Sequence, residues 1–271
     1  MNEDLVNMNP LNNDKQNLNL LAIETSTHSL ELGVALDGKV AGSFSIYRNQ
    51  KHVEILVESI GKLLKSLSVE LRELDAITVD VGPGLFTGIR TGIATTMALA
   101  KSTNLRTIPI SSLEILAHQG RFLKGDLIVP IIDAKKDEVY FCPFSIIPTS
   151  SPNLLKSIAE FNANLETKGN AMSSSLSNVF DHLASIDGIG DKKVVLLGSG
   201  LNRYCEDFIK LAENENRFNA VLFADDYFEK PDVQSLLKIA QQVGLIDSVF
   251  ASDLKPNYLR QANIKIGWET R

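Results

Sequence analysis

Cysteine is scarce in this chain of 271 residues, which has only Cys142 and Cys205. Two cysteines cannot build a disulfide framework, and they fit a reducing, cytoplasmic environment. Lys and Arg number 27 against 33 Asp and Glu, and the net charge of −6 argues against a chain that grips nucleic acid by itself. No apolar run approaches the roughly 18 residues that span a bilayer, and no charged-then-apolar leader precedes a small-residue cleavage site. We therefore expect a soluble, cytoplasmic protein with no membrane contact.

Signatures of metal and nucleophile chemistry are also missing. The four histidines are scattered, and no HExxH, CxxC or His-x-x-x-His spacing occurs. No serine lies in a G-x-S-x-G elbow. The sequence therefore predicts neither a metal site nor a catalytic residue.

Apolar residues are plentiful, at 44% of the chain, which is enough for a substantial core and excludes global disorder. Residues 1–19 differ from the rest, because seven of them are Asn and their apolar residues follow no period. We expect these residues to form a disordered extension before the fold.

After this extension the pattern predicts three strands and then helices that alternate with strands. Short apolar or alternating runs indicate strands, and the pair Asp37–Gly38 indicates a hairpin turn. Apolar residues at helical spacing predict a helix over His52–Leu67. The expected strands are Leu18–Glu24, Leu30–Asp37, Lys39–Tyr47, Ala76–Val81 and Arg106–Ile110, and the further helices are Thr87–Lys101 and Ser112–Gln119. The resulting order is βββαβαβα.

The second half begins near Asp126, and residues 148–190, rich in Ser, Asn and Pro, are only weakly patterned. The predicted strands are Leu127–Ala134, Glu138–Ile146, Val194–Gly198 and Ala220–Phe223, and the predicted helices lie near Asn202–Leu211 and at Val233–Val243. We expect an N-terminal lobe at 20–115 and a C-terminal lobe at 116–224. A C-terminal helix and tail at 225–271 would pack back on the N-terminal lobe.

The most specific motif is the run GPGLFTGIR, which joins a strand to a helix. Its characteristic residues are Gly82, Pro83, Gly84, Phe86, Thr87, Gly88 and Arg90. The glycines permit positive φ and close backbone approach, so the loop either cradles a ligand at a helix N-terminus or forms a tight turn. The helix then carries Gly88, Gly92, Thr96 and Ala100 at steps of four. This small-residue ridge lets another helix or a sheet approach closely.

Two further turns are open to a nucleotide-binding interpretation. Thr25, Ser26 and Thr27 lie between the first two strands, and Gly198 and Gly200 follow a buried strand of the second half. Hydroxyls and glycines at such turns can face phosphates, but they also satisfy the backbone groups of the turn itself.

Together these motifs resemble the TsaB (YeaZ) family, whose members take part in making threonylcarbamoyladenosine at position 37 of tRNA. The resemblance rests on LLAIETST at the start of the fold, on GPGLFTGIR, on IIDAKKDEVY and, more loosely, on PNYLR at 256–260. It covers residues 20 to about 145 well. It implies the two-lobed actin/Hsp70/sugar-kinase (ASKHA) fold, an α/β architecture with βββαβαβα-type lobes of which the second is degenerate. The paralogous TsaD family shares the GPG loop but continues it without FTG-[IV]-R.

The resemblance implies a catalytically silent relative of the TsaD transferase. That paralogue binds its metal through His-x-x-x-His, where this chain has Ser112 and Leu116, and its later Thr-Asp-Asn segment is absent here. Such a relative would be a scaffold subunit that pairs with a TsaD-type transferase through helices of the N-terminal lobe. The residues expected to bind the partner are His52, Leu56, Ile60 and Leu63 on one helix and Gly88, Gly92, Thr96 and Ala100 on the other.

Further partners implied by the resemblance are a TsaE-type ATPase and, indirectly through the complex, tRNA. A homodimer through the same surface is expected when the partner is absent. The isolated chain would hold no cofactor, and ATP or ADP would bind only in the complex.

Two other functions stay open. An active ASKHA enzyme would bind ATP between its lobes through Thr25–Thr27 and Gly198–Gly200. A glycoprotease is a weaker alternative, because the chain lacks zinc and nucleophile signatures.

Overall fold

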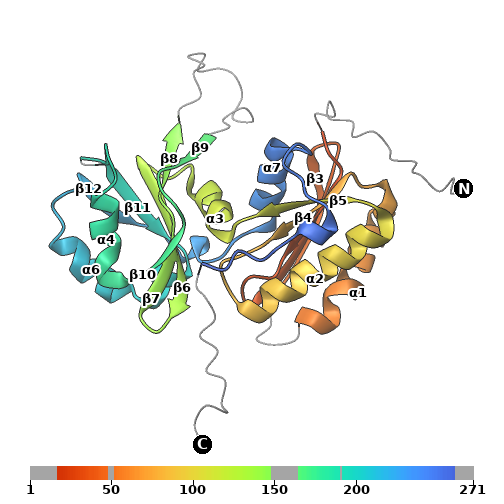
Figure 1. The fold of residues 1–271 in the computed structure, drawn as a ribbon, viewed down its shortest axis with the longest axis horizontal. Coiled ribbons are helices and arrows are strands. Elements are labelled where there is room, and N and C mark those ends of the chain that lie inside the picture. Colours follow the sequence, from red (N-terminus) through yellow and green to blue (C-terminus); the bar gives the residue numbers. More distant parts are fainter. Residues whose placement is uncertain (1–16, 48–51, 148–163, 190, 260–271) are drawn as a thin grey trace, which may run out of the picture.

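The computed structural model describes residues 17–47, 52–147, 164–189 and 191–259. Within these ranges the chain forms two α/β lobes, each built on its own sheet, and helix α3 lies between them (Figure 1). Residues 1–16 of the predicted extension lie outside the described residues, as do 260–271 of the predicted C-terminal segment. No helix in the described ranges combines the length and the apolar character needed to cross a membrane.

The N-terminal lobe has a five-stranded sheet in the order β3-β2-β1-β4-β5. The central strands β1 and β4 run parallel to each other and are buried along their whole length, as expected for strands covered on both faces. The elements are β1 (Leu20–Glu24), β2 (Ser29–Leu36), β3 (Lys39–Tyr47), α1 (His52–Ser66), η1 (Leu71–Glu73), β4 (Ala76–Asp80), α2 (Phe86–Thr103), β5 (Arg106–Ile110) and α3 (Ser112–Gly120). Apart from the short turn η1, this is the βββαβαβα order that the sequence predicts.

The C-terminal lobe has a seven-stranded sheet whose main path is β10-β7-β6-β11-β12, with β8 attached to β6 and β9 attached to β8. The elements are β6 (Leu127–Lys135), β7 (Glu138–Phe141), β8 (Phe144–Ile147), β9 (Asn164–Thr167), β10 (Met172–Ser175), α4 (Leu176–Ala184), β11 (Lys193–Leu197), α5 (Ser199–Arg203), α6 (Cys205–Glu213), β12 (Ala220–Phe223) and η3 (Asp226–Phe228). The extra strands β8 and β9 are the main departure from the N-terminal lobe.

Two sequence-based predictions for this lobe are wrong in detail. The strand predicted over Glu138–Ile146 divides at Pro143, which has no amide hydrogen to give to a ladder. As a result β7 pairs with β6 and β10, whereas β8 pairs with β9 and with the start of β6. The helix predicted near Asn202–Leu211 is two helices, α5 and α6, which meet at Tyr204 with a non-helical φ of −117°.

Helix α7 (Val233–Val243) follows the C-terminal lobe in the chain but packs on the N-terminal lobe, against β1 and β2 (Figure 1). Alternate residues of β1 explain why, since Leu20 and Ala22 face α7 whereas Leu21 and Ile23 face α1 and α2. On β2, a Cβ at Gly33 would lie only 2.9 Å from Leu237 Cδ1 of α7. The absence of a side chain at Gly33 therefore lets α7 lie directly on the sheet. The last short element is η4 (Ala251–Asp253).

Replacing Leu237 by Ala should lower the free energy of unfolding by about 2–5 kcal/mol, because the buried side chain leaves a cavity between α7 and the sheet. Denaturant titration measures this loss. Ile246→Ala is the control, since Ile246 is 78% exposed and its truncation should change stability by no more than about 0.5 kcal/mol. An equally small loss for Leu237→Ala would show that α7 does not belong to the cooperative core.

Candidate functional site

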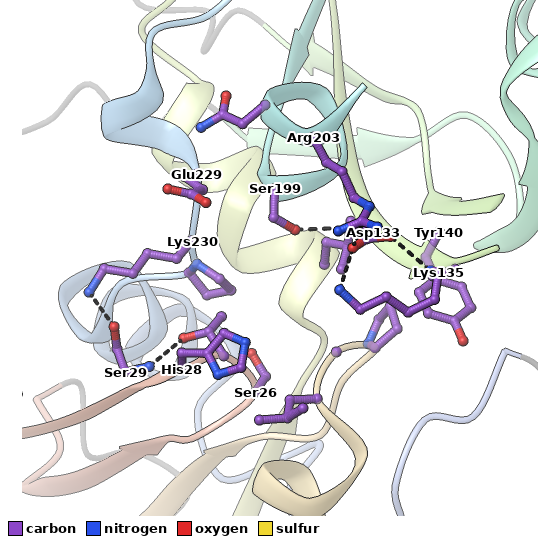
Figure 2. Close-up of a pocket in the computed structure, with 18 of the residues that line it drawn as sticks. Ser26, His28, Ser29, Asp133, Lys135, Tyr140, Ser199, Arg203, Glu229 and Lys230 are labelled. Carbon is purple, nitrogen blue, oxygen red and sulfur yellow. Dashed lines mark hydrogen bonds and ion pairs between the residues drawn. The ribbon is translucent and has the colours of Figure 1, made fainter. Parts of the chain in front are cut away.

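A cleft of about 710 Å³ lies between the two lobes. One wall consists of the turn after β1 and the GPG loop, which is residues 82–85, and the other consists of the end of β6 and helix α5. Figure 2 shows Ser26, His28 and Ser29 on one side of it and Asp133, Ser199 and Arg203 on the other. Side chains with hydroxyl groups therefore line both sides of the cleft.

The charged side chains that line the C-terminal wall are engaged with one another. Asp133 lies 2.6 Å from Lys135 Nζ and 3.4 Å from Arg203 Nε (Figure 2). Burial alone would raise the pKa of Asp133, but hydrogen bonds from Lys135 and the charge of Arg203 hold that pKa below its usual range. A ligand that needs either cation must therefore compete with Asp133.

On the opposite side of the cleft, Lys230 is likewise bound by groups of the same chain. Its Nζ lies 2.6 Å from Glu31 and 2.9 Å from the hydroxyl of Ser29. Among the residues that the structure describes, no group of three or more His, Cys, Asp and Glu side chains is placed to hold a metal ion.

The structure separates the predicted nucleotide-binding residues. Ser26 and Thr27 line the cleft, whereas Thr25 is buried and its hydroxyl donates to the carbonyl of Gly88 at 2.9 Å. Gly198 and Gly200 pack against Ile131 of β6, where a Cβ at Gly200 would lie 2.7 Å from the Ile131 side chain. Thr25, Gly198 and Gly200 therefore make packing contacts, and the nucleotide role of the five residues stays a prediction.

Several lining residues were not singled out from the sequence. Ser199 stands between the two predicted glycines, and Asp133 and Lys135 belong to the IIDAKKDEVY segment, so local signals existed for these three. Lys230 offered no such signal, because it reaches Glu31 across 199 residues of chain.

The GPG loop is fixed to the turn after β1. The amide of Leu85 donates to the carbonyl of Ser26 at 2.6 Å, and a Cβ at Gly84 would lie 2.5 Å from that same oxygen. Gly82 has a φ of +98° and its amide donates to Asp80 Oδ1 at 2.7 Å. Glycine at 82 and 84 therefore allows the backbone of the loop to touch the turn.

The small-residue ridge of α2 faces inward, which corrects the predicted partner-binding surface. Gly88, Gly92, Thr96 and Ala100 are all buried. A Cβ at Gly88 would overlap the carbonyl oxygen of Thr25, and a Cβ at Gly92 would overlap its hydroxyl. The ridge therefore contacts the sheet of its own lobe.

The apolar residues of α1 that were predicted to bind the partner also face inward. Leu56, Ile60 and Leu63 are buried in the hydrophobic core under β1 and β2. They cannot contact another chain without disrupting that core. The side chain of His52, at the first position of α1, lies outside the described residues.

The solvent-facing sides of α1 and α2 carry small and apolar residues beside the exposed ion pair of Glu58 and Lys62. Val57 is 60% exposed and Gly61, one turn later, is exposed as well, and Ala94 and Ala98 are exposed on α2. We call these four residues the outer face. An exposed glycine inside a helix costs about 1 kcal/mol relative to alanine, and no atom lies within 4 Å of a Cβ built at Gly61. Packing within the described chain therefore does not explain this glycine.

Phe86 and Arg90, the two large residues of the loop motif, contact Tyr258 in the C-terminal segment. The ring of Tyr258 stacks on Phe86 with centroids 5.5 Å apart, and Arg90 Nε donates to the Tyr258 hydroxyl at 2.7 Å. The guanidinium of Arg90 also lies 3.8 Å from the centroid of Phe86, a cation–π distance. The loop motif and the PNYLR segment therefore form one unit, although they lie far apart in the sequence.

This combination of fold and motif corresponds to a known family. The family model for TsaD, tRNA N6-adenosine threonylcarbamoyltransferase, matches residues 47–268. The chain belongs to this family. Several proteins that it resembles in sequence are named "tRNA threonylcarbamoyladenosine biosynthesis protein TsaB", which confirms the predicted resemblance to TsaB (YeaZ).

The TsaB protein of Bacillus subtilis is 33% identical over 123 residues, which cover 45% of this chain and 53% of the relative. The TsaB protein of Haemophilus influenzae is 33% identical over 127 residues, with 46% and 53% covered. The chain thus spans about half the length of the curated relatives it matches. The solved structure of YeaZ from Pseudomonas aeruginosa superposes with a TM-score of 0.69 at 24% identity, over 89% of this chain and 100% of that one. This likeness confirms the predicted two-lobed fold.

The two positions that the resemblance compares with metal-binding histidines of the TsaD paralogue are buried here. Ser112 and Leu116 are both fully buried, and the Ser112 hydroxyl donates to Asp80 Oδ1 at 2.6 Å. Neither side chain lines the cleft, so neither presents a metal-binding atom there.

Replacing Gly88 by Ala should destabilise the chain by more than about 2 kcal/mol, because the new methyl group overlaps the Thr25 carbonyl. Gly61→Ala is the matched control in a neighbouring helix, and it should stabilise the chain by up to about 1 kcal/mol. Thermal and denaturant unfolding of both variants measures the difference. If the two substitutions had equal effects, α2 would not be in close contact with the turn after β1.

Proposed function

We propose that this chain is a non-catalytic subunit of the machinery that forms N6-threonylcarbamoyladenosine at position 37 of tRNA, where it binds and supports a TsaD-type transferase. The observation that carries the proposal is the outer face of α1 and α2. Its small side chains would let two helices of another protein approach closely. Contact with a partner would also explain why Gly61 is a glycine, since no atom of the described chain lies near it. The names of the TsaB relatives supply the pathway.

A supporting role rather than a catalytic one is favoured by two features. The positions that would carry metal-binding histidines hold Ser112 and Leu116, and both are committed to the interior. The cleft cations are engaged with Asp133 and Glu31. The net charge of −6 suits a subunit that leaves most tRNA contact to its partner.

The proposed assembly is a heterodimer in which α1 and α2 pair with two helices of the transferase, as in a four-helix bundle. A TsaE-type ATPase joins this pair, and ATP or ADP binds only in the assembled complex. Without the transferase, two copies of the chain would cover the same outer face as a homodimer.

Charge substitutions on the outer face test the interface. Gly61→Glu and Ala94→Glu should each weaken binding to a TsaD-type partner by roughly tenfold or more, because a carboxylate would be buried without a partner. Isothermal titration calorimetry measures the dissociation constant, and circular dichroism verifies the fold. Glu213→Lys, on an exposed position of the other lobe, is the control and should bind normally. Gly92→Leu should unfold the chain instead, since it enters the contact with Thr25. Unchanged binding by both outer-face variants would exclude this surface.

The role in tRNA modification needs a separate reconstitution. Purified transferase and ATPase, supplied with tRNA, ATP and an activated threonylcarbamoyl donor, should form threonylcarbamoyladenosine efficiently only when this chain is added. Modification at the same rate without it would overturn the proposed function, whatever the binding data show.

A second candidate is an enzyme that binds ATP in the cleft, which Ser26 and Thr27 line. Titration of the isolated chain with ATP and magnesium distinguishes the two functions. Under the proposal no heat of binding is expected, whereas binding with turnover that Ser26→Ala and Thr27→Ala weaken would favour the enzyme.

A further inference from the structure

Two acidic residues end adjacent parallel strands at the centre of the N-terminal lobe. Glu24 is the last residue of β1 and Asp80 is the last residue of β4. Ile23 of β1 pairs with Val79 of β4. Glu24 and Asp80, the next residues, therefore lie side by side and point to the same face of the sheet. Both are completely buried, at 0% exposure. Two such neighbours cannot both stay ionised at low energetic cost.

Each carboxyl group has one oxygen with two donors and one with none. Glu24 Oε1 accepts from the amide and the hydroxyl of Ser26, both at 2.6 Å. Asp80 Oδ1 accepts from the amide of Gly82 at 2.7 Å and from the hydroxyl of Ser112 at 2.6 Å. The other two oxygens, Glu24 Oε2 and Asp80 Oδ2, are buried and receive no donor from the described residues.

Among the described residues, the main influences on the pair are burial, hydrogen bonds and other acidic groups. The charged group that β2 presents to Glu24 is the anion Glu31, which is itself bound to Lys230 of the segment before α7. Helix α3 contributes the hydroxyl of Ser112, and the GPG loop contributes the amide of Gly82. The main influences on either carboxyl group include no cation.

We propose that Glu24 and Asp80 share one proton, and that the resulting carboxyl–carboxylate hydrogen bond ties together the turn after β1, the GPG loop and the start of α3. The proton supplies the donor that both orphaned oxygens lack. The register of β1 and β4 places Glu24 next to Asp80, as this bridge requires. Release of the proton to solvent would leave two buried negative charges on neighbouring strands.

The electrostatics of the pair agree with this arrangement. Burial, reinforced by the charge of Asp80, raises the pKa of Glu24 well above its usual range. Burial also raises the pKa of Asp80 to about 6, despite the hydrogen bonds from Ser112 and Gly82. Both folded-state pKa values lie above their values in the unfolded chain. The stabilising contribution is therefore complete below the ordinary carboxyl range and is lost as the pH rises from there through the folded values, the lower of which is about 6.

The test is the pH dependence of unfolding in Glu24→Gln. The amide can donate to Asp80 while its oxygen still accepts from Ser26, so the bridge is kept without a titrating proton. Between pH 6 and 8, the unfolding equilibrium constant of the wild type should rise by up to about tenfold per pH unit relative to that of Glu24→Gln. Glu213→Gln removes an exposed carboxylate from the other lobe and should follow the wild type. Parallel pH profiles for the wild type and Glu24→Gln would overturn the proposal.

Infrared spectroscopy of the wild type tests the proton directly. At pH 7 the wild type should show a protonated-carboxyl band that disappears in Glu24→Gln. If that variant does not fold, Asp80→Asn takes its place, because its amide can donate to an ionised Glu24 and the band should again be lost. The proposal fails if the wild type lacks the band or if the band persists unchanged in the folded variant.

Discussion

The contact between α2 and the turn after β1 is the constraint on which the rest of the N-terminal lobe depends. Gly88 and Gly92 have no side chains, so α2 can lie against Thr25, and the hydroxyl of Thr25 donates to the carbonyl of Gly88. This contact places the GPG loop next to Ser26, where the amide of Leu85 completes the backbone connection. The same helix start then presents Phe86 and Arg90 to Tyr258. A single close approach thus orders a turn, a loop, a helix and the C-terminal segment.

Because the inner side of α2 is committed to this contact, only its opposite side is available to another molecule. The division is sharp, since Gly92 is enclosed whereas Ala94 and Ala98 face solvent. Gly88 and Gly92 on the inner side and Ala94 and Ala98 on the outer side therefore serve different purposes on one helix. The cations of the cleft are likewise engaged within the chain. Lys135, Arg203 and Lys230 each lie next to a carboxylate of the same chain. Both features support the proposal that this chain acts through its surface rather than through its cleft.

The order of the N-terminal lobe could be predicted because it depends on local periodicity and on turn residues. The GPG motif was also visible, since glycine and proline mark such a loop directly. The sequence could not predict which way the small-residue ridge of α2 faces. Small residues at steps of four show that something approaches closely, but not whether it is Thr25 of the same chain or another protein. Contacts such as Lys230 with Glu31, 199 residues apart, leave no local pattern. In the C-terminal lobe, β9 and β10 lie in polar sequence where packing decides the structure.

The position of α7 has a consequence for how the chain is made. The N-terminal sheet has its strands by residue 110, yet the face formed by Leu20, Ala22 and Ile108 is covered by residues 233–243. On a ribosome, the whole C-terminal lobe must emerge before this apolar face is sealed. The first lobe therefore cannot mature as an independent unit during translation, and a nascent chain stalled before residue 233 would display the face to chaperones.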